Sequence, residues 1–328
     1  MARPRKYDIC LEATPYYHCV SRCVRRAYLC GDDALTGQSY EHRRQWVEDR
    51  LLSLTHCFVI DICAYAVMSN HCHVVLHVDV DKAASLTTFE IVERWHGLFA
   101  GTHLTRQFLA GHRLTDAEIR AVEEQAETWR RNLMSVSWFM RCLNEHIARR
   151  ANQEDDCTGR FWEGRFKCQA LLDESALLAC MAYVDLNPVR AGIAHSPEES
   201  EYTSIHKRLA VVRGDPESLQ SVGLMPFRSR SRHNSANYLN FNLRDYLELL
   251  DWTGRAIRID AYGAIQTNLP PIASRLQIES TAWLAMTEGF ESIFHALVGP
   301  EEAVLGVCAQ TGRNWSHGIN ACRRCFPT

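Results

Sequence analysis

Two adjacent apolar runs, joined by a short turn, constrain the fold of this chain more than any other feature of its sequence. Residues 58–67 and 71–78 have the length and the β-branched and aromatic content of strands, and residues 68–70 form the turn between them. Residues 15–24 predict an earlier strand, and residues 39–55 predict a helix. The order strand, helix, strand, strand predicts an α+β fold, in which helices cover one face of an antiparallel sheet.

Beyond residue 78 the sequence predicts an insertion and then three further elements. Acidic residues are frequent in residues 115–128, which we interpret as part of a solvated helical insertion over residues 80–135. The three later elements are an amphipathic helix, a strand or hairpin, and a helix that Asp173 caps and Pro188 ends, over residues 137–150, 159–172 and 173–187.

The character of the chain changes after residue 213. A Gly-Asp-Pro turn and the basic segment 227–233 predict a linker, and helices are expected over residues 238–250 and 280–298. We therefore predict a domain of residues 1–213 and a mainly helical C-terminal domain of residues 214–328.

The composition excludes several classes of protein. The 36 Lys and Arg against 39 Asp and Glu give a net charge of −3, so any surface that binds nucleic acid must be local. No apolar run approaches the roughly 18 residues of a membrane-spanning helix, and the N-terminus has no apolar block typical of a secretory signal. We expect a cytoplasmic protein whose 14 cysteines are reduced.

The motif His71-Cys72-His73 is the sharpest sign of chemistry. Side chains alternate along a strand, so His71 and His73 share one face, while Cys72 and Val74 point to the other. With the apolar set facing the helices, the two imidazoles face solvent and form a two-nitrogen metal site that needs a third ligand. Two exposed histidines on a half-buried strand are an equally good interpretation.

The helix over residues 173–187 offers a candidate third ligand. Tyr183 and Asn187 are four residues apart, so they lie together on the helix, away from the centre of its apolar stripe. The hydroxyl and the amide can therefore reach the same point. Taken alone, these two residues favour a structural interpretation, with Tyr183 at the rim of the core and Asn187 closing the helix.

Three motifs in a fixed order change that balance. MSNHCHVVL, GRFWEGRFKCQALL and AYVDLNPVRAGI resemble an MPNHVHLLL-like strand, a WQGRFK-like segment and a YIxLNPVRAG-like helix of the HUH-type transposases with one catalytic tyrosine, in particular the REP-associated tyrosine transposases. The start YYHCVSRCVRRAYL is similar to the family's YHVTSRGNRR. The resemblance covers roughly residues 15–210 and says little about residues 215–328. Ser69 stands where Pro is common in the family, and Cys72 where an aliphatic residue is frequent.

The resemblance implies a ferredoxin-like HUH domain and assigns roles to its residues. It implies that His71, His73 and Asn187 bind Mg²⁺, with Mn²⁺ as an alternative, and that Tyr183 is the nucleophile. The implied reaction cleaves and rejoins single-stranded or hairpin DNA through a 5′-phosphotyrosine intermediate.

Two other functions stay open at this point. One is a catalytically idle, domesticated protein that binds DNA hairpins; the other is a replication initiator or relaxase of the HUH class, although the YVDLNPVRAG segment favours the transposase branch. A homodimer in which Tyr183 serves a partner's metal site is as consistent with the sequence as a monomer.

Basic side chains in the family-like segments predict a track for DNA phosphates. The predicted DNA-binding residues are Arg22, Arg25, Arg26, Arg160, Arg165, Lys167 and Arg190. Aromatic residues on which bases could stack are interleaved with them, namely Tyr16, Tyr17, Phe161, Trp162 and Phe166. For any one aromatic, a place in the core is the simpler interpretation.

The C-terminal residues 299–326 predict two short helices around a turn near Thr311 and Gly312. The second helix is expected to carry residues suited to DNA, namely Arg313, Trp315, Arg323 and Arg324. This pattern is consistent with a helix-turn-helix that adds DNA affinity and equally with an ordinary helical cap. A zinc site is the weaker alternative because its ligands would be irregularly spaced, at Cys308, His317, Cys322 and Cys325.

Overall fold

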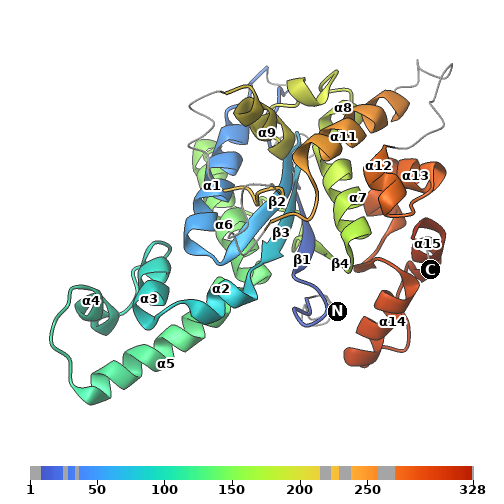
Figure 1. Cartoon of the computed structure of the whole chain (residues 1–328). Helices are drawn as coiled ribbons and strands as arrows, with labels where there is room; N and C mark the ends of the chain where they lie inside the picture. The colour runs from blue at the N-terminus through green and yellow to red at the C-terminus, as the bar shows by residue number, and fades with distance from the viewer. Residues whose placement is uncertain are drawn as a thin grey trace.

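A five-stranded sheet forms the centre of the molecule (Figure 1). The computed structural model describes residues 9–24, 29–33, 37–214, 223–228, 238–257 and 270–326. The strands are β1 (Tyr16–Arg22), β2 (Ile60–Val67), β3 (His71–Val78), β4 (Lys167–Leu171) and β5 (Leu297–Val298).

The strand order gives the fold class. The strands lie in the order β2-β3-β1-β4-β5, with the first four antiparallel and β5 parallel to β4. The helix α1 (Arg43–Cys57) connects β1 to β2, and α6 (Val136–Glu154) precedes β4. The first four strands and these two helices form the βαββαβ unit of ferredoxin-like folds. The α+β class predicted from the sequence is confirmed.

Helices α1 and α6 cover one face of this sheet (Figure 1). Tyr65 on β2 donates a hydrogen bond from its hydroxyl to Glu48 on α1 at 2.5 Å, and Asn144 on α6 donates its amide to the hydroxyl of Ser21 on β1 at 2.8 Å. The two helices are also joined to each other at the end where α1 begins and α6 ends.

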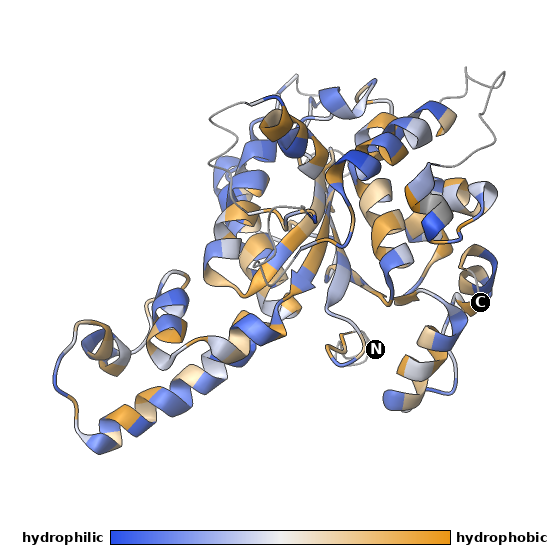
Figure 2. Ribbon diagram, in the orientation of Figure 1, coloured by the Kyte–Doolittle hydropathy of each residue, from blue (hydrophilic) through white to orange (hydrophobic). Residues whose placement is uncertain are grey.

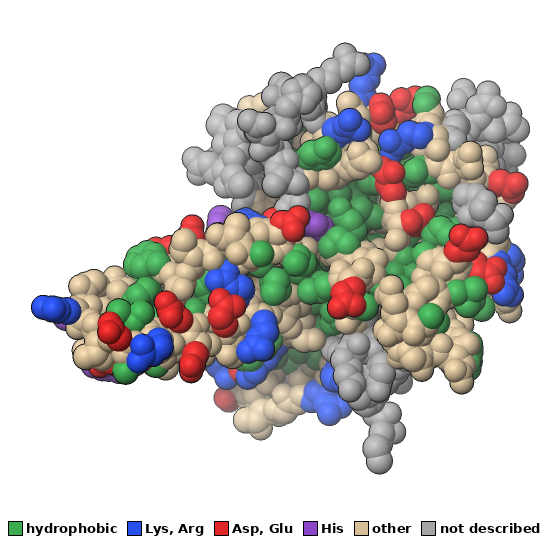
Figure 3. Space-filling model, turned by 60° about the horizontal axis from the view of Figure 1, so that its bottom comes forward, with side chains coloured by type: hydrophobic (Ala, Val, Ile, Leu, Met, Phe, Trp, Pro, Cys, Tyr) green, Lys and Arg blue, Asp and Glu red, His purple; other side chains and the backbone are tan. Residues whose placement is uncertain are grey.

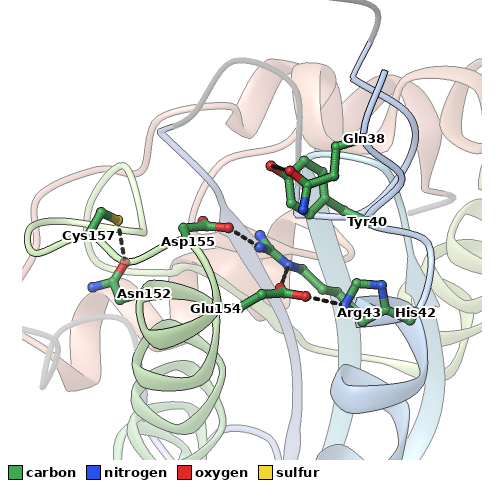
Figure 4. A network of polar contacts seen from close by, with 8 residues as sticks. All are labelled: Gln38, Tyr40, His42, Arg43, Asn152, Glu154, Asp155 and Cys157. Atoms are coloured by element: carbon green, nitrogen blue, oxygen red, sulfur yellow. Dashed lines mark hydrogen bonds and ion pairs between the residues drawn. The ribbon is translucent and has the colours of Figure 1, made fainter. Parts of the chain in front are cut away.

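Arg43 is the residue that joins them (Figure 4). Its buried guanidinium donates to Glu154 at 2.6 Å and forms an ion pair with Asp155. Because Arg43 contacts two carboxylates, its charge stays paired with one of them if the other is removed. This network supports the layer of helices and lies on the opposite side of the sheet from the candidate site.

Helix α7 (Glu174–Asp185) covers the other face of the sheet. The predicted cap is confirmed, because the side chain of Asp173 accepts a hydrogen bond from the backbone N–H of Ala176 at 2.8 Å. Every residue of α7 from Ser175 to Asp185 is buried, since α13 (Ser280–Ile293) packs on its outer side. The expectation that helices cover only one face was therefore wrong. Figure 2 shows hydrophobic residues both along the strands and on α7.

Helix α7 ends earlier than the sequence predicted. Helix α7 ends at Asp185, and a short helix α8 (Asn187–Arg190) follows with Pro188 in its first turn. Proline is well placed there because the first turn of a helix needs no backbone N–H donor from it.

The insertion forms a helical arm that projects from the sheet (Figure 1). It consists of α2 (Val80–Ser85), α3 (Thr88–His96), α4 (His103–Leu109) and α5 (Asp116–Leu133). The buried indoles of Trp95 and Trp129 stack at 5.1 Å between ring centroids, with 7° between their planes. On its surface, Lys and Arg side chains are interspersed with Asp and Glu (Figure 3).

Residues after 213 continue the same sheet. The backbone N–H of Ala170 donates to the carbonyl of Ala296, and that of Leu172 to the carbonyl of Val298, each at 2.8 Å. The remaining helices are η2 (Pro197–Glu199), α9 (Ser204–Val212), α11 (Leu243–Ile257), α12 (Pro271–Arg275), α14 (Glu301–Gln310) and α15 (Ile319–Cys325). Most of the predicted linker lies outside the described residues. Both predicted domains thus contribute strands to one sheet, and α13 of the second packs on α7 of the first.

None of the described helices has both the length and the apolar character that crossing a membrane requires. All 14 cysteines lie in the part of the chain that the structure describes, and none of them forms a disulfide there.

Candidate active site

Strand β3 presents His71 and His73 to the face that α7 covers. Their rings lie 4.7 Å apart at 79°. His73 pairs with Val20 on β1 and Ala66 on β2, and it is fully buried, whereas His71 near the strand end is partly exposed. The alternation predicted from the sequence is correct, but the prediction that both imidazoles face solvent was wrong for His73. His73 is buried because the apolar helix α7 packs against this face of the sheet.

A chain of hydrogen bonds fixes which ring nitrogen of His73 carries the proton. The carbonyl of Phe294 accepts from the amide Nε2 of Gln169 at 2.8 Å, so Gln169 Oε1 must be the acceptor for His18 Nδ1 at 2.7 Å. Neutral His18 then has a lone pair on Nε2, which accepts the Nδ1 proton of His73 at 3.0 Å. His73 Nε2 is left as a bare acceptor, buried and with no hydrogen-bond partner among the residues that the structure describes.

Burial keeps these imidazoles neutral. It lowers the pKa of His18 to about 4, and it lowers the pKa of His71 to about 4 together with the positive charge of Arg22. Burial and the neighbouring imidazole of His18 lower the pKa of His73 well below its ordinary value. Neutral imidazole is the form that binds metal ions. His71 is also oriented, because its Nδ1 lies 2.6 Å from the side-chain oxygen of Asn70.

Tyr183 stands edge-on to His73 beneath a cation. Its ring centroid is 5.5 Å from that of His73, with 87° between the planes, and the side chain is 7% exposed. The guanidinium carbon of Arg190 lies 4.0 Å from the centre of the Tyr183 ring. Burial raises the pKa of Tyr183, and the charge of Arg190 acts in the opposite direction. Tyr183 is therefore a phenol at neutral pH, held beside a cation that favours its ionised form.

Helix α13 closes the site from outside. The ring of Phe290 lies 5.7 Å from that of Tyr183 and 5.9 Å from that of His18. Arg190 is also fixed by this helix, because it donates to the carbonyl of Thr287 at 2.7 Å. Residues far beyond position 213 thus form a wall of the site.

Asn187 lies at the start of α8 and is 5% exposed. Its amide Nδ2 is buried, and no described residue forms a hydrogen bond with it. No hydrogen bond or ring contact joins it to His71 or His73 among the parts of the chain that the structure describes. The structure therefore brings together the two imidazoles and Tyr183, and places Asn187 four residues beyond the tyrosine, at the start of α8.

The donor set fits a divalent metal ion. Within the described residues no three His, Cys, Asp or Glu side chains are grouped to hold a metal, so a ligand beyond the two imidazoles has to be of another type. The side-chain carbonyl oxygen of an amide such as that of Asn187 is of that type. Imidazole nitrogen suits Mn²⁺ better than it suits Mg²⁺, which prefers oxygen ligands.

The predicted DNA-binding residues are dispersed over several surroundings. Arg22 and Arg160 are exposed near the sheet end, and Lys167 forms an ion pair with Glu291 on α13 at 2.6 Å. Arg190 belongs to the site itself. Arg165 is exposed and lines a pocket described below. Arg25 and Arg26 lie outside the described residues.

Most of the predicted stacking aromatics are part of the core. Tyr17, Phe161 and Trp162 are 0%, 2% and 9% exposed, and the indole N–H of Trp162 donates to the carbonyl of Asn144 at 2.8 Å. The prediction that bases stack on these three residues was wrong. Phe166 is half-buried at the edge of that pocket.

Two expectations for the C-terminus also change. Arg313 and Trp315 lie in the segment that links α14 to α15, not on the second helix, and Arg323 is held by an ion pair with Glu301. The predicted zinc ligands form no group that could hold a metal among the described residues.

Sequence reasoning missed His18, Gln169 and Phe290. His18 follows Tyr16 and precedes Val20 on one face of β1, so the alternation already places it on a defined face. Its pairing with β3 and β4, which brings it to His73 and Gln169, becomes visible only in the sheet register.

Comparisons with known proteins add one likeness. Neither a protein-family model nor a curated protein matches this sequence. Among solved structures the chain is similar to a REP-associated tyrosine transposase bound to a REP hairpin, with 13% identity and a TM-score of 0.38, over 65% of this chain and 87% of that chain.

Proposed function

We propose that this protein is a metal-dependent endonuclease and strand transferase for single-stranded or hairpin DNA, with Tyr183 as its nucleophile. One observation carries the proposal. The hydrogen-bond chain from the Phe294 carbonyl through Gln169 and His18 leaves a bare, buried nitrogen on His73, next to the ring of Tyr183. A neutral imidazole without a partner inside a protein is costly unless it has a ligand to bind.

The proposed reaction uses the hydroxyl of Tyr183 as its nucleophile. Its Oη forms a bond to phosphorus while the bond from phosphorus to the 3′ oxygen breaks, which gives a 5′-phosphotyrosine and a free 3′-hydroxyl. The phenol proton is released, and the leaving 3′ oxygen takes up one proton from solvent. Attack by the 3′-hydroxyl of another strand on the phosphotyrosine restores a phosphodiester and the phenol, so the cycle needs no nucleotide cofactor.

The residues around Tyr183 have separate roles. Arg190 favours the phenolate by its charge above the ring. His71, His73 and Asn187 would hold the divalent ion, Mg²⁺ or Mn²⁺, which when bound neutralises charge on the non-bridging phosphate oxygens. His18 and Gln169 are positioning residues, because they keep the proton of His73 on Nδ1 and its Nε2 lone pair free.

An idle DNA-hairpin-binding protein is the second candidate function. The observation that favours it is the cover over Tyr183, which is 7% exposed beneath Phe290. Such a protein would bind DNA without forming a covalent bond to it.

A covalent-trapping experiment separates these functions. The full chain is incubated with single-stranded hairpin DNA labelled on the 3′ side of the nick, with Mg²⁺, with Mn²⁺ or with chelator, and run on a denaturing gel. We expect a labelled protein band that requires metal, disappears in Tyr183→Phe and persists in the control Tyr202→Phe. A hairpin that is bound without a covalent band under any metal condition supports the idle binder, and a band that survives in Tyr183→Phe places the nucleophile elsewhere.

A further inference from the structure

A pocket of about 900 Å³ opens between β4 and the segment that links α14 to α15. Its volume falls within the roughly 300–1,000 Å³ of typical ligand sites. One wall comes from residues around the start of β4, and the other from residues 313–317 and the segment before β5. Figure 1 shows β4, α13 and the two C-terminal helices at the same end of the molecule.

The lining of this pocket is more basic than the chain as a whole. Arg165, Lys167 and Arg313 line it, and Glu291 is the one acidic side chain among its lining residues. That carboxylate is already paired with Lys167. The whole chain has a net charge of −3, so a local excess of cations concentrates positive potential here. A phosphate-bearing ligand fits that charge.

An exposed indole lies on the same lining. Trp315 is 60% exposed, more than the other large hydrophobic side chains of the described residues. Its ring lies 4.2 Å from that of His317, at 59°, so the side chain is supported from one side and open on the other. Phe166 contributes a second aromatic ring from the opposite wall. A flat ring at the mouth of a basic pocket is what an unpaired nucleobase needs for stacking.

The pocket also adjoins the candidate active site. His18 and Gln169, which set the proton of His73, both line it. A DNA strand with one nucleotide in the pocket therefore has its neighbouring phosphates close to the wall behind which Tyr183 lies.

We infer that this pocket binds single-stranded DNA beside the cleavage position, with a base stacked on Trp315 and a phosphate held by Arg313 and Arg165. The inference rests on the proposed function for the identity of the strand, but binding itself needs neither Tyr183 nor a metal. Duplex DNA is excluded as the preferred ligand, because its bases are already stacked on one another and present no free face to the indole.

The test is a binding measurement that contains no catalysis. The full chain carrying Tyr183→Phe is titrated in chelator against a labelled single strand of mixed sequence, and against the same strand annealed to its complement. Adding Trp315→Ala should weaken binding of the single strand by about 5- to 150-fold. Trp315→Phe should keep most of the affinity, because it keeps a ring. The control Phe89→Ala, which removes a 46% exposed aromatic from the arm, should leave the affinity unchanged.

The role of Arg313 is tested by the salt dependence of DNA binding. Arg313→Gln should lower the slope of log affinity against log salt by about 0.7, the value for one phosphate contact on a single strand. Arg120→Gln, on the exposed surface of α5, is the matched control and should leave the slope unchanged.

Three outcomes overturn the inference: no binding of the single strand, equal affinity of Trp315→Ala and Phe89→Ala, or equal binding of duplex and single strand. These outcomes are independent of the covalent-trapping experiment. If Trp315→Ala weakens binding but no covalent adduct forms, the binding pocket is supported and the nuclease function is refuted. If an adduct forms but Trp315→Ala binds normally, the nuclease function is supported and the binding pocket is refuted.

Discussion

Acidification should destabilise this protein through His18, a fully buried residue whose pKa falls from its ordinary value of 6.5 to about 4. Between pH 6.5 and pH 4 the unfolded chain binds a proton at this position, and the folded chain does not. The free energy of unfolding therefore falls as the pH falls through that window, and the stability is fully present above pH 6.5.

The size of the effect follows from the two pKa values. Taking the folded chain as neutral at His18 and the unfolded chain as titrating normally, lowering the pH from 7.5 to 5 costs about 2 kcal/mol at this one residue. His71 and His73 shift in the same direction, so the whole protein should lose more than that. The contribution of His18 is isolated by removing it.

The assay is urea denaturation in chelator at pH 7.5 and at pH 5, for the wild type and for His18→Gln. The glutamine cannot take up a proton, so its loss of stability on acidification should be smaller than that of the wild type by about 2 kcal/mol. His112→Gln, which removes an exposed histidine, is the control and should behave like the wild type. Equal pH dependence in wild type and His18→Gln would refute the assignment of His18 as a neutral link to His73.

Four further variants test other parts of the proposal. His73→Ala should abolish Mn²⁺ binding measured by calorimetry at pH 7.5, whereas Asn187→Ala should only weaken it; unchanged Mn²⁺ affinity in His73→Ala would move the metal site. Arg190→Gln should shift the pH–rate profile of DNA cleavage to higher pH, because the phenol loses its nearby cation, and an unshifted profile would argue against that role. Phe290→Ala should lower the free energy of unfolding by about 3–5 kcal/mol, measured by urea denaturation, because α13 packs its ring on the buried site; a loss below about 1 kcal/mol would show that α13 is not firmly docked.

The local patterns of the sequence predicted local features correctly. Alternation placed His71 and His73 on one face of a strand, and Asp173 was identified as a helix cap. Both features depend on residues close together in the chain, where backbone geometry alone fixes the outcome.

The features that the sequence did not predict depend on packing between residues far apart in the chain. His73 is buried because α7, apolar on every side, packs over it and α13 in turn covers α7. Trp162 and Phe161 resemble base-stacking residues in sequence, yet both are buried in the core. His18 and Gln169 enter the site only through the pairing of β1 with β3 and β4.

The most direct test of the central claim is the mass of the peptide that carries the DNA. After reaction with hairpin DNA and Mn²⁺, nuclease treatment and trypsin, the peptide of residues 168–190 can be read by mass spectrometry, and its sequence contains Tyr183 as its single tyrosine. We expect a residual nucleotide on this peptide, localised to Tyr183 by fragmentation and absent when metal is chelated. A nucleotide on any other peptide, or an unmodified peptide from protein that has bound the hairpin with metal present, would contradict it.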